Sequence, residues 1–157
     1  MTPAATVDTR VALATAPETL ALAGRLLHEF NTAYDDPTPG ADALATRLAE
    51  LVAAGDTDVL LGDEHGVAVV RYRPSLWSAA DEAYLAELWV DPSVRRTGLG
   101  RALLRAALER ARERGCDLLD LATSEDDPEA RSLYESEGLH ATEGAGGPTT
   151  FHYEIDL

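Results

Sequence analysis

Two glycines and three arginines lie within seven residues of one another, a pattern that suits an anion-binding loop. Gly98 and Gly100 stand where an apolar segment gives way to a long amphipathic one, and Arg95, Arg96 and Arg101 surround them. Glycines at a helix start let the backbone approach a ligand, and the N–H groups of the first turn then face an anion. A third glycine and a Gly-Lys-Ser/Thr are both missing, which excludes the dinucleotide and Walker patterns. The segment predicts a pyrophosphate cradle; the alternative is an ordinary helix start with a solvated arginine face.

The charges of the chain fall into two regions of opposite sign. Its 157 residues include 13 arginines, no lysine and 28 acidic residues, for a net charge of −15. Segment 93–114 carries seven of the arginines against two glutamates, so the remainder is strongly acidic. An acidic body repels nucleic acid. We therefore expect no nucleic-acid partner, and a small anionic ligand at the basic segment.

The composition favours one globular domain over residues 1–157. Hydrophobic residues make up 45% of the chain and charged residues 26%, and no apolar run reaches the length of a membrane span. Cys116 is the single cysteine, and the four histidines are scattered, so we expect no disulfide and no metal site. The N-terminus does not resemble a signal peptide. We expect a cytoplasmic protein with no membrane partner, and a homodimer is compatible with this sequence.

Hydrophobic periodicity predicts alternating strands and helices. We expect helices over residues 17–30, 41–54, 98–114 and 128–137, with glycines 115 and 138 ending the last two. We expect strands over residues 7–13, 59–61, 67–72, 84–90, 118–122, 139–142 and 150–155. This order mixes hairpin and crossover connections, which indicates an α/β fold: a mixed sheet with helices on both faces.

Two motifs together resemble the GCN5-related N-acetyltransferase (GNAT) superfamily. Arg95-x-x-Gly98-x-Gly100 is similar to its acetyl-CoA signature, Arg/Gln-x-x-Gly-x-Gly/Ala. Residues 127–139, Asp-Pro-Glu-Ala-Arg-Ser-Leu-Tyr-Glu-Ser-Glu-Gly-Leu, are similar to its second motif, Asn-x-x-Ala-x-x-Leu/Phe-Tyr-x-x-x-Gly-Phe. The motifs cover about residues 84–142, and the element order agrees over nearly the whole chain. The resemblance implies the GNAT fold, a central, mostly antiparallel mixed sheet flanked by helices.

The resemblance also implies acetyl-CoA as the cofactor. In this superfamily the strand before the cradle splays away from the following strand, and the pantetheine arm lies in the gap against main-chain groups. Asp127 departs from the usual asparagine: it can cap the helix but cannot donate an amide N–H. The implied cofactor contacts are Leu88, Trp89, Val90, Arg95, Arg96, Thr97, Gly98, Leu99, Gly100, Arg101, Asp127 and Tyr134.

Glu87 and Tyr134 are the candidate catalytic residues. An alkylammonium with a pKa of about 10.4 must lose a proton before it can attack. Glu87 interrupts an apolar strand and can take that proton directly or through water, whereas the alternatives are a solvent-facing side chain or an arginine pair. The second motif implies that Tyr134 protonates the leaving thiolate; the alternative is a packing role. If no base is well placed, a water chain takes the proton.

The superfamily usually frames its acceptor pocket with the loop between the first two helices and the loop before the cradle strand. In this sequence these loops supply Tyr34, Asp35, Asp36 and Trp77, which we expect to bind the acceptor together with Glu87. An acidic pair beside aromatic rings suits a cationic amine. The alternative for Asp35 and Asp36 is a solvated loop.

These expectations describe an acetyl-CoA-dependent N-acetyltransferase that transfers the acetyl group directly to a primary amine. The expected acceptor is a small molecule: a polyamine, an amino acid derivative or an aminoglycoside-like compound. One alternative is a protein or peptide N-acetyltransferase, and another is a non-catalytic acyl-CoA-binding sensor. A nucleotide-binding domain that uses the same loop is a third.

Overall fold

The computed structural model describes residues 8–157, and the chain forms two compact units, residues 1–120 and 121–157. The first unit contains three α-helices, α1 (Pro17–Ala33), α2 (Ala41–Ala54) and α3 (Leu99–Glu113), with a short 3-10 helix, Pro92–Val94, before α3. Its strands are β1 (Val11–Leu13), β2 (Thr57–Gly62), β3 (Gly66–Pro74), β4 (Asp81–Val90) and β5 (Leu118–Asp120). The second unit contains α4 (Pro128–Ser136).

The five strands form one sheet in the order β1-β2-β3-β4-β5. The first four pair antiparallel, and β5 alone runs parallel to its neighbour β4. The crossover through α3 makes this parallel pair possible, because a parallel connection needs a long return segment. The prediction of a mixed, mostly antiparallel sheet is confirmed.

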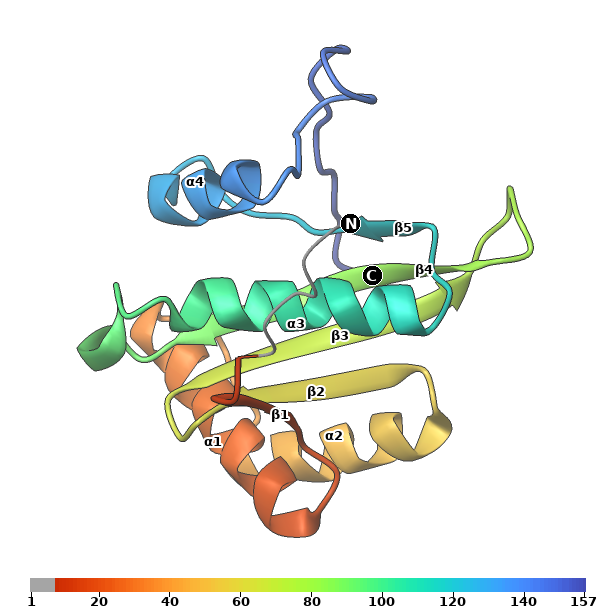
Figure 1. The fold of residues 1–157 in the computed structure, drawn as a ribbon. Coiled ribbons are helices and arrows are strands. Elements are labelled where there is room, and N and C mark those ends of the chain that lie inside the picture. Colours follow the sequence, from red (N-terminus) through yellow and green to blue (C-terminus); the bar gives the residue numbers. More distant parts are fainter. Residues whose placement is uncertain (1–7) are drawn as a thin grey trace. The chain divides into compact units, whose positions relative to one another are not determined.

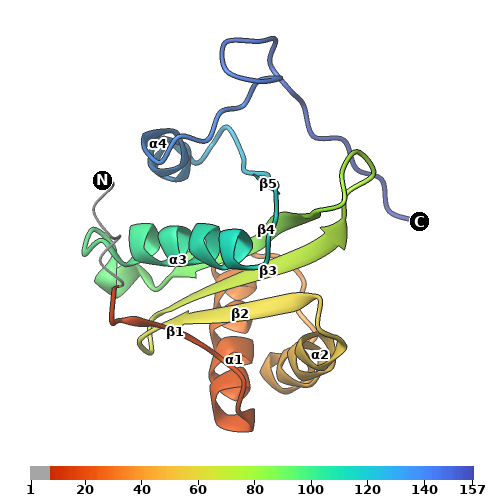
Figure 2. The ribbon, with the colours of Figure 1, turned by 45° about the vertical axis from the view of Figure 1, so that its right-hand side comes forward.

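Helices cover both faces of this sheet, as predicted (Figures 1 and 2). On one face, Val59, Val69 and Trp89 join a buried cluster with residues of α1 and α2. Successive side chains of a strand point to opposite faces of the sheet. Leu60 and Val70, which follow Val59 and Val69 directly, are also buried and therefore belong to the face that α3 covers. The alternation explains why β2 and β3 are apolar nearly throughout.

Two glycines let the first half of α3 pack closely on the sheet. Gly62 and Gly66 flank the β2–β3 turn. A Cβ atom at Gly62 would lie 2.7 Å from the Leu99 side chain, and one at Gly66 would lie 2.8 Å from the Leu103 side chain. Leu99 is 3% exposed and Leu103 is fully buried. This close approach places the N-terminus of α3 beside the end of β4.

Polar contacts hold the second half of α3. Asp58 on β2 accepts a hydrogen bond from the Tyr72 hydroxyl at 2.7 Å and another from Arg110 Nε at 2.9 Å. The Arg114 guanidinium lies 3.9 Å from the centre of the Tyr72 ring, and its Nη2 donates to the Gly55 carbonyl at 2.9 Å. Burial and the neighbouring Asp58 carboxylate raise the pKa of the Tyr72 hydroxyl, which therefore stays protonated as a donor.

A glycine in α1 controls the approach of α2. A Cβ at Gly24 would lie 2.5 Å from the Ala41 carbonyl oxygen and 2.8 Å from the Ala45 amide nitrogen, both rigid backbone atoms. We expect Gly24→Ala to destabilise the protein by roughly 1–3 kcal/mol, although alanine is the better helix former by about 1 kcal/mol. Thermal unfolding should show a lower Tm, by about 2–4 °C per kcal/mol. Ala21→Gly on the exposed face of α1 measures the propensity effect alone, and a Tm above wild type for Gly24→Ala would contradict the prediction.

The second unit confirms one part of the prediction and corrects another. Helix α4 begins after Asp127, whose carboxylate accepts from the Ala130 N–H at 3.0 Å, and Gly138 follows it with a φ of 92°. The expected strands 139–142 and 150–155 are absent, and this region holds a single bridge, between Thr142 and Thr149. The alternating apolar residues that suggested the last strand, among them Phe151 and Tyr153, are 76% and 86% exposed. A strand pattern forms a strand only where a partner strand pairs with it, and none of the described strands does so.

The boundaries of other strands and helices differ by a few residues from the predicted ones. The expected first strand, 7–13, is observed only as Val11–Leu13, and its residue 7 lies outside the described residues.

No helix within residues 8–157 combines the length and hydropathy that a bilayer crossing requires. The expectation of one domain over 1–157 stays a prediction.

Candidate functional site

Strand β4 has an open edge over its second half. Its pairing with β5 covers only residues 82–84. On the other edge, Val69 pairs with Glu87 and Val70 with Leu85, so Ala86 is the extra residue of a β-bulge. A bulge bends its strand and strengthens the local twist. The bend therefore coincides with the separation of β4 from β5, and residues 85–90 present main-chain groups on an edge that β5 does not cover.

The cradle predicted from the glycines lies directly after this edge. Gly98 is the N-cap of α3 with a left-handed φ of 84°, a conformation that favours glycine. It offers no capping side chain, and the first intrahelical donor is the Ala102 N–H, which donates to the Gly98 carbonyl at 3.0 Å. By helix geometry the Leu99 and Gly100 amides have no intrahelical acceptor, so they are available to an anion.

Side-chain contacts fix the loop between β4 and α3. Asp91 accepts from the Ser93 N–H at 2.8 Å, and this bond lowers the pKa of its carboxyl group. Arg10 Nη1 donates to the Thr97 carbonyl at 3.2 Å while its guanidinium pairs with Asp8. Arg96 adopts a left-handed φ of 64° within this loop. The loop is thus held in shape by the folded chain itself.

The seven arginines of segment 93–114 do not form one patch. Arg95, Arg96 and Arg101 belong to the loop and the first turn of α3, whereas Arg110 and Arg114 bind β2 and the α2–β2 loop at the far end of that helix. The expectation of a local basic patch therefore narrows to the three arginines at the cradle. Arg110 and Arg114 stabilise the position of α3.

Glu87 faces the α1 and α2 side of the sheet and lines a cavity of about 190 Å³. None of the described hydrogen bonds or ion pairs involves its side chain, and burial raises the pKa of its carboxyl group. The side chain is half-buried and, within residues 8–157, belongs to no arginine pair; its role as a base stays a prediction. It stands on the same stretch of β4 whose edge is open.

The cavity brings together residues that are far apart in the sequence. Its wall is mostly apolar, and Arg47 and Arg71 join Glu87 as its charged members. The complete lining is Leu27, Leu44, Arg47, Leu48, Leu51, Val69, Arg71, Ala86 and Glu87. Sequence reasoning missed both arginines, although Arg71 interrupts an apolar strand as Glu87 does.

The other residues expected to bind the acceptor lie outside the cavity wall. Tyr34 makes an edge-to-face contact with Phe30, which stacks on Trp89 with ring centres 6.0 Å apart. Asp35 and Asp36 are exposed, and Trp77, on the β3–β4 loop, is 88% exposed. Their role in acceptor binding stays a prediction.

The expected cofactor contacts on β4 are compatible with main-chain binding. Trp89 is 5% exposed and buries its ring in the core with α1, so its side chain does not lie at the open edge. Leu99 likewise buries its side chain. Both residues can contact a ligand only through their backbone, as the resemblance implied for β4.

Tyr134 belongs to α4 in the second unit. Burial raises the pKa of its hydroxyl, and the negative charge of Asp127 raises it further. The hydroxyl therefore carries its proton at neutral pH. That protonation state is required of a general acid.

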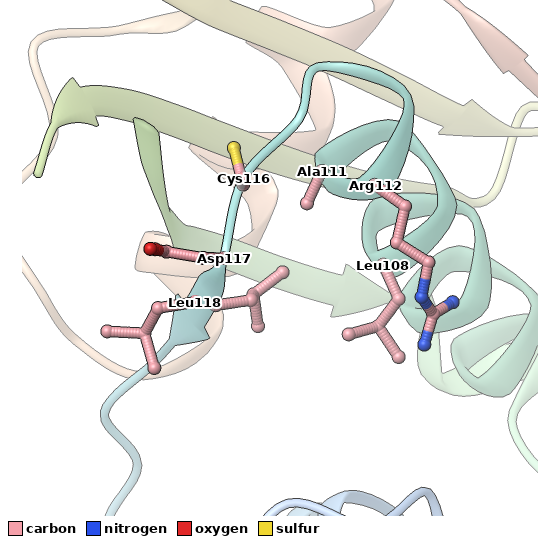
Figure 3. Close-up of a pocket in the computed structure, with 7 residues that line it drawn as sticks. Leu108, Ala111, Arg112, Cys116, Asp117 and Leu118 are labelled. Atoms are coloured by element: carbon pink, nitrogen blue, oxygen red, sulfur yellow. The ribbon is translucent and has the colours of Figure 1, made fainter. Parts of the chain in front are cut away.

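A second hollow, of about 200 Å³, lies between the end of α3 and β5. Figure 3 shows Leu108 and Ala111 of α3 directed towards the segment that carries Cys116 and Leu118. None of the expected site residues lines it. Burial raises the pKa of the Cys116 thiol, which disfavours the reactive thiolate.

Known proteins resemble this chain in sequence and in fold. The model of the acetyltransferase (GNAT) family matches residues 25–139, most of the chain. A solved structure of a protein from Arthrobacter sp. FB24, described as a candidate acetyltransferase, is 40% identical with a TM-score of 0.86. The match covers 98% of this chain and 99% of that one.

Two curated relatives match over shorter segments. Mycothiol acetyltransferase of Beutenbergia cavernae is 39% identical over 68 residues, 41% of this chain and 23% of that enzyme. The ribosomal protein bS18-alanine N-acetyltransferase of Escherichia coli K12 is 42% identical over 60 residues, 38% of this chain and 40% of the enzyme. The chain thus spans less than half the length of either curated relative.

Proposed function

The chain belongs to the GNAT acetyltransferase family, and we propose that it is an enzyme that transfers an acetyl group from acetyl-CoA to the primary amine of a small molecule. The observation that carries this proposal is the position of Glu87. It lines a mostly apolar cavity on one side of the β4 segment whose edge is left open by β5. The second half of β4 therefore borders both a cavity for the acceptor and an open strand edge for acetyl-CoA.

The described residues fit an acetyl-CoA molecule. Main-chain groups of residues 88–90 would bind the pantetheine arm, and the Leu99 and Gly100 amides with the cradle arginines would bind the pyrophosphate. When bound, acetyl-CoA supplies the activated acetyl group and a thiol leaving group. The protein would bind and orient acetyl-CoA, and the acetyl group would pass directly to the acceptor. No cysteine or serine that could form an acyl-enzyme lies among the residues that line the cavity.

Glu87 would act as the general base. The acceptor arrives as an ammonium, and its nitrogen must lose a proton to become a nucleophile. A carboxylate whose pKa is raised by burial is a better proton acceptor than one in water, because the driving force for proton transfer is greater. The mostly apolar wall of the cavity disfavours the charged ammonium and so favours the neutral amine.

Tyr134 would act as the general acid, and its substitution is a direct test. We expect Tyr134→Phe to lower kcat by about tenfold and to leave the acetyl-CoA affinity unchanged, because only the proton donor is lost. Stopped-flow thiol release measures the rate, and calorimetry measures the affinity. Tyr153→Phe, at an 86% exposed tyrosine, is the matched control. Equal rates for Tyr134→Phe and wild type would return Tyr134 to a packing role.

The function is tested by thiol release from acetyl-CoA with a panel of polyamines, amino acids, aminoglycosides and short peptides. Acetylation of a small amine with a kcat/KM well above that of any peptide supports the proposal. Preference for a peptide would indicate a protein N-acetyltransferase. Tight acetyl-CoA binding with no transfer to any acceptor would favour a sensor and overturn the enzymatic proposal.

A further inference from the structure

The cavity beside Glu87 contains positive charge that a simple amine acceptor does not need. Arg71 extends from β3 and Arg47 from α2, and both line the cavity with Glu87. A polyamine or aminoglycoside brings only further positive charge to such a wall. The two arginines therefore disfavour polycationic acceptors and suit a ligand with an anionic group.

Among the described residues, Arg71 makes one long ion pair, with Asp56, and its Nε has no hydrogen-bond partner. Its Nε is buried and has no hydrogen-bond partner within residues 8–157. Its nearest acid is Asp56, with an Nη2–Oδ2 distance of 3.8 Å, well beyond the 2.7–2.9 Å or so of a charge-assisted hydrogen bond. A buried donor without a partner is unfavourable, and the part of the side chain that a ligand oxygen can reach is the 40% that stays exposed.

Arg47 has a partner that does not hold it firmly. It pairs with Glu50 at 3.0 Å one helical turn further on, but both side chains are more than half exposed. Exposed pairs of this kind contribute little stability. The guanidinium can therefore turn to a ligand in the cavity without a large loss.

We infer that the acceptor carries a carboxylate as well as the amine that is acetylated, and that Arg71, assisted by Arg47, binds this carboxylate. The inference rests on the proposed function and names its substrate class: small amino acids and their derivatives. Glu87 takes the proton of the amine, and Arg71 and Arg47 bind the carboxylate in the same cavity. The leucines of α1 and α2 that line the cavity contact the aliphatic part of the acceptor.

The cavity has a volume of about 190 Å³ and is open to solvent, so it has room for a small amino acid without limiting the size of the acceptor. An acceptor that is bound through both its amine and its carboxylate has its nitrogen oriented before transfer.

Matched pairs of acceptors test the inference: L-lysine against cadaverine and L-ornithine against putrescine, which differ only by the carboxylate. In the wild type we expect kcat/KM to be at least about tenfold higher for the amino acid, the contribution of a charge-assisted hydrogen bond. Arg71→Gln should raise KM for the amino acid by about 10- to 100-fold and leave the diamine unaffected. Arg71→Lys keeps the charge and should restore part of the preference. Arg73→Gln, at an exposed arginine paired with Glu82, is the control.

Binding of the acetylated product gives a readout without turnover. N-α-acetylglycine has the carboxylate and no amine, and N-acetylglycinamide lacks the charge. Saturation-transfer NMR should detect the acid on the wild type and on Arg73→Gln, but not on Arg71→Gln. Selective binding of the acid without any transfer would keep the carboxylate site at Arg71 and remove the proposed function. Transfer to diamines and amino acids with equal efficiency would keep the function and overturn the inference, as would equal binding of the two products.

Discussion

Glu87→Gln is expected to lower kcat/KM for the acceptor amine by about 100-fold or more, the usual size of a lost acid–base group. Glutamine keeps the shape of the side chain but cannot take a proton. The wild-type rate should rise with pH through the pKa of Glu87, which burial holds above its ordinary value of 4.5. The variant should lose this limb of the pH profile and keep the limb that belongs to the amine.

A second measurement separates this chemical effect from unfolding. The folded state binds the proton of Glu87 more tightly than the unfolded state, so ionisation of Glu87 costs stability as pH rises through its folded pKa. Glu87→Gln removes that cost, and its Tm at neutral pH should equal or exceed the wild-type value. Glu64→Gln, in the exposed β2–β3 turn, controls for the loss of one negative charge. If the pH profiles of Glu87→Gln and wild type superimpose, Glu87 is not the base.

Gly98→Trp is expected to weaken acetyl-CoA binding by more than about 100-fold, because the indole would cover the amides at the start of α3. The space beside Gly98 is open: a Cβ atom there would have Arg10 Nη2 as its neighbour, 3.8 Å away. A larger side chain therefore has room to lie over the cradle. Calorimetric titration with CoA measures the loss directly and needs no acceptor.

Gly115→Trp is the matched control for this substitution. Gly115 follows the other end of the same helix, has a φ of 77° and would have nothing within 4 Å of a Cβ. Both variants impose a left-handed φ on a non-glycine residue, at a cost of about 1–2 kcal/mol in stability. Equal losses of Tm with a loss of CoA binding only at position 98 would locate the cradle. Unchanged CoA affinity in Gly98→Trp would refute it.

Features fixed by short stretches of chain could be predicted from the sequence. The glycine that starts α3, the glycines that end α3 and α4, and the Asp127 cap were all expected, and their observed conformations confirm them. Each depends on the backbone preference of one residue or on a side chain that reaches three residues ahead. The apolar periodicities likewise predicted most of the helices and strands, because they record which face each element buries.

Features that depend on a distant partner were predicted poorly. The C-terminal segment 150–155 has the alternation of a strand, yet it forms none, since no described strand pairs with it. The arginines of segment 93–114 looked like one patch, but Asp58 and Tyr72 on the sheet bind two of them at the far end of α3. Local charge says nothing about which side of a helix meets a carboxylate.

The sequence by itself thus indicated the family, the order of most elements and a position for the proposed anion cradle, because motifs and periodicity are local properties of the chain. Only the tertiary structure decided which residues line the proposed acceptor cavity. Leu27, Arg47, Arg71 and Glu87 come from four elements, and helix packing on the sheet brings them to one wall. The physical reason is that a cavity is formed by what several elements leave unfilled, and no single segment carries that information.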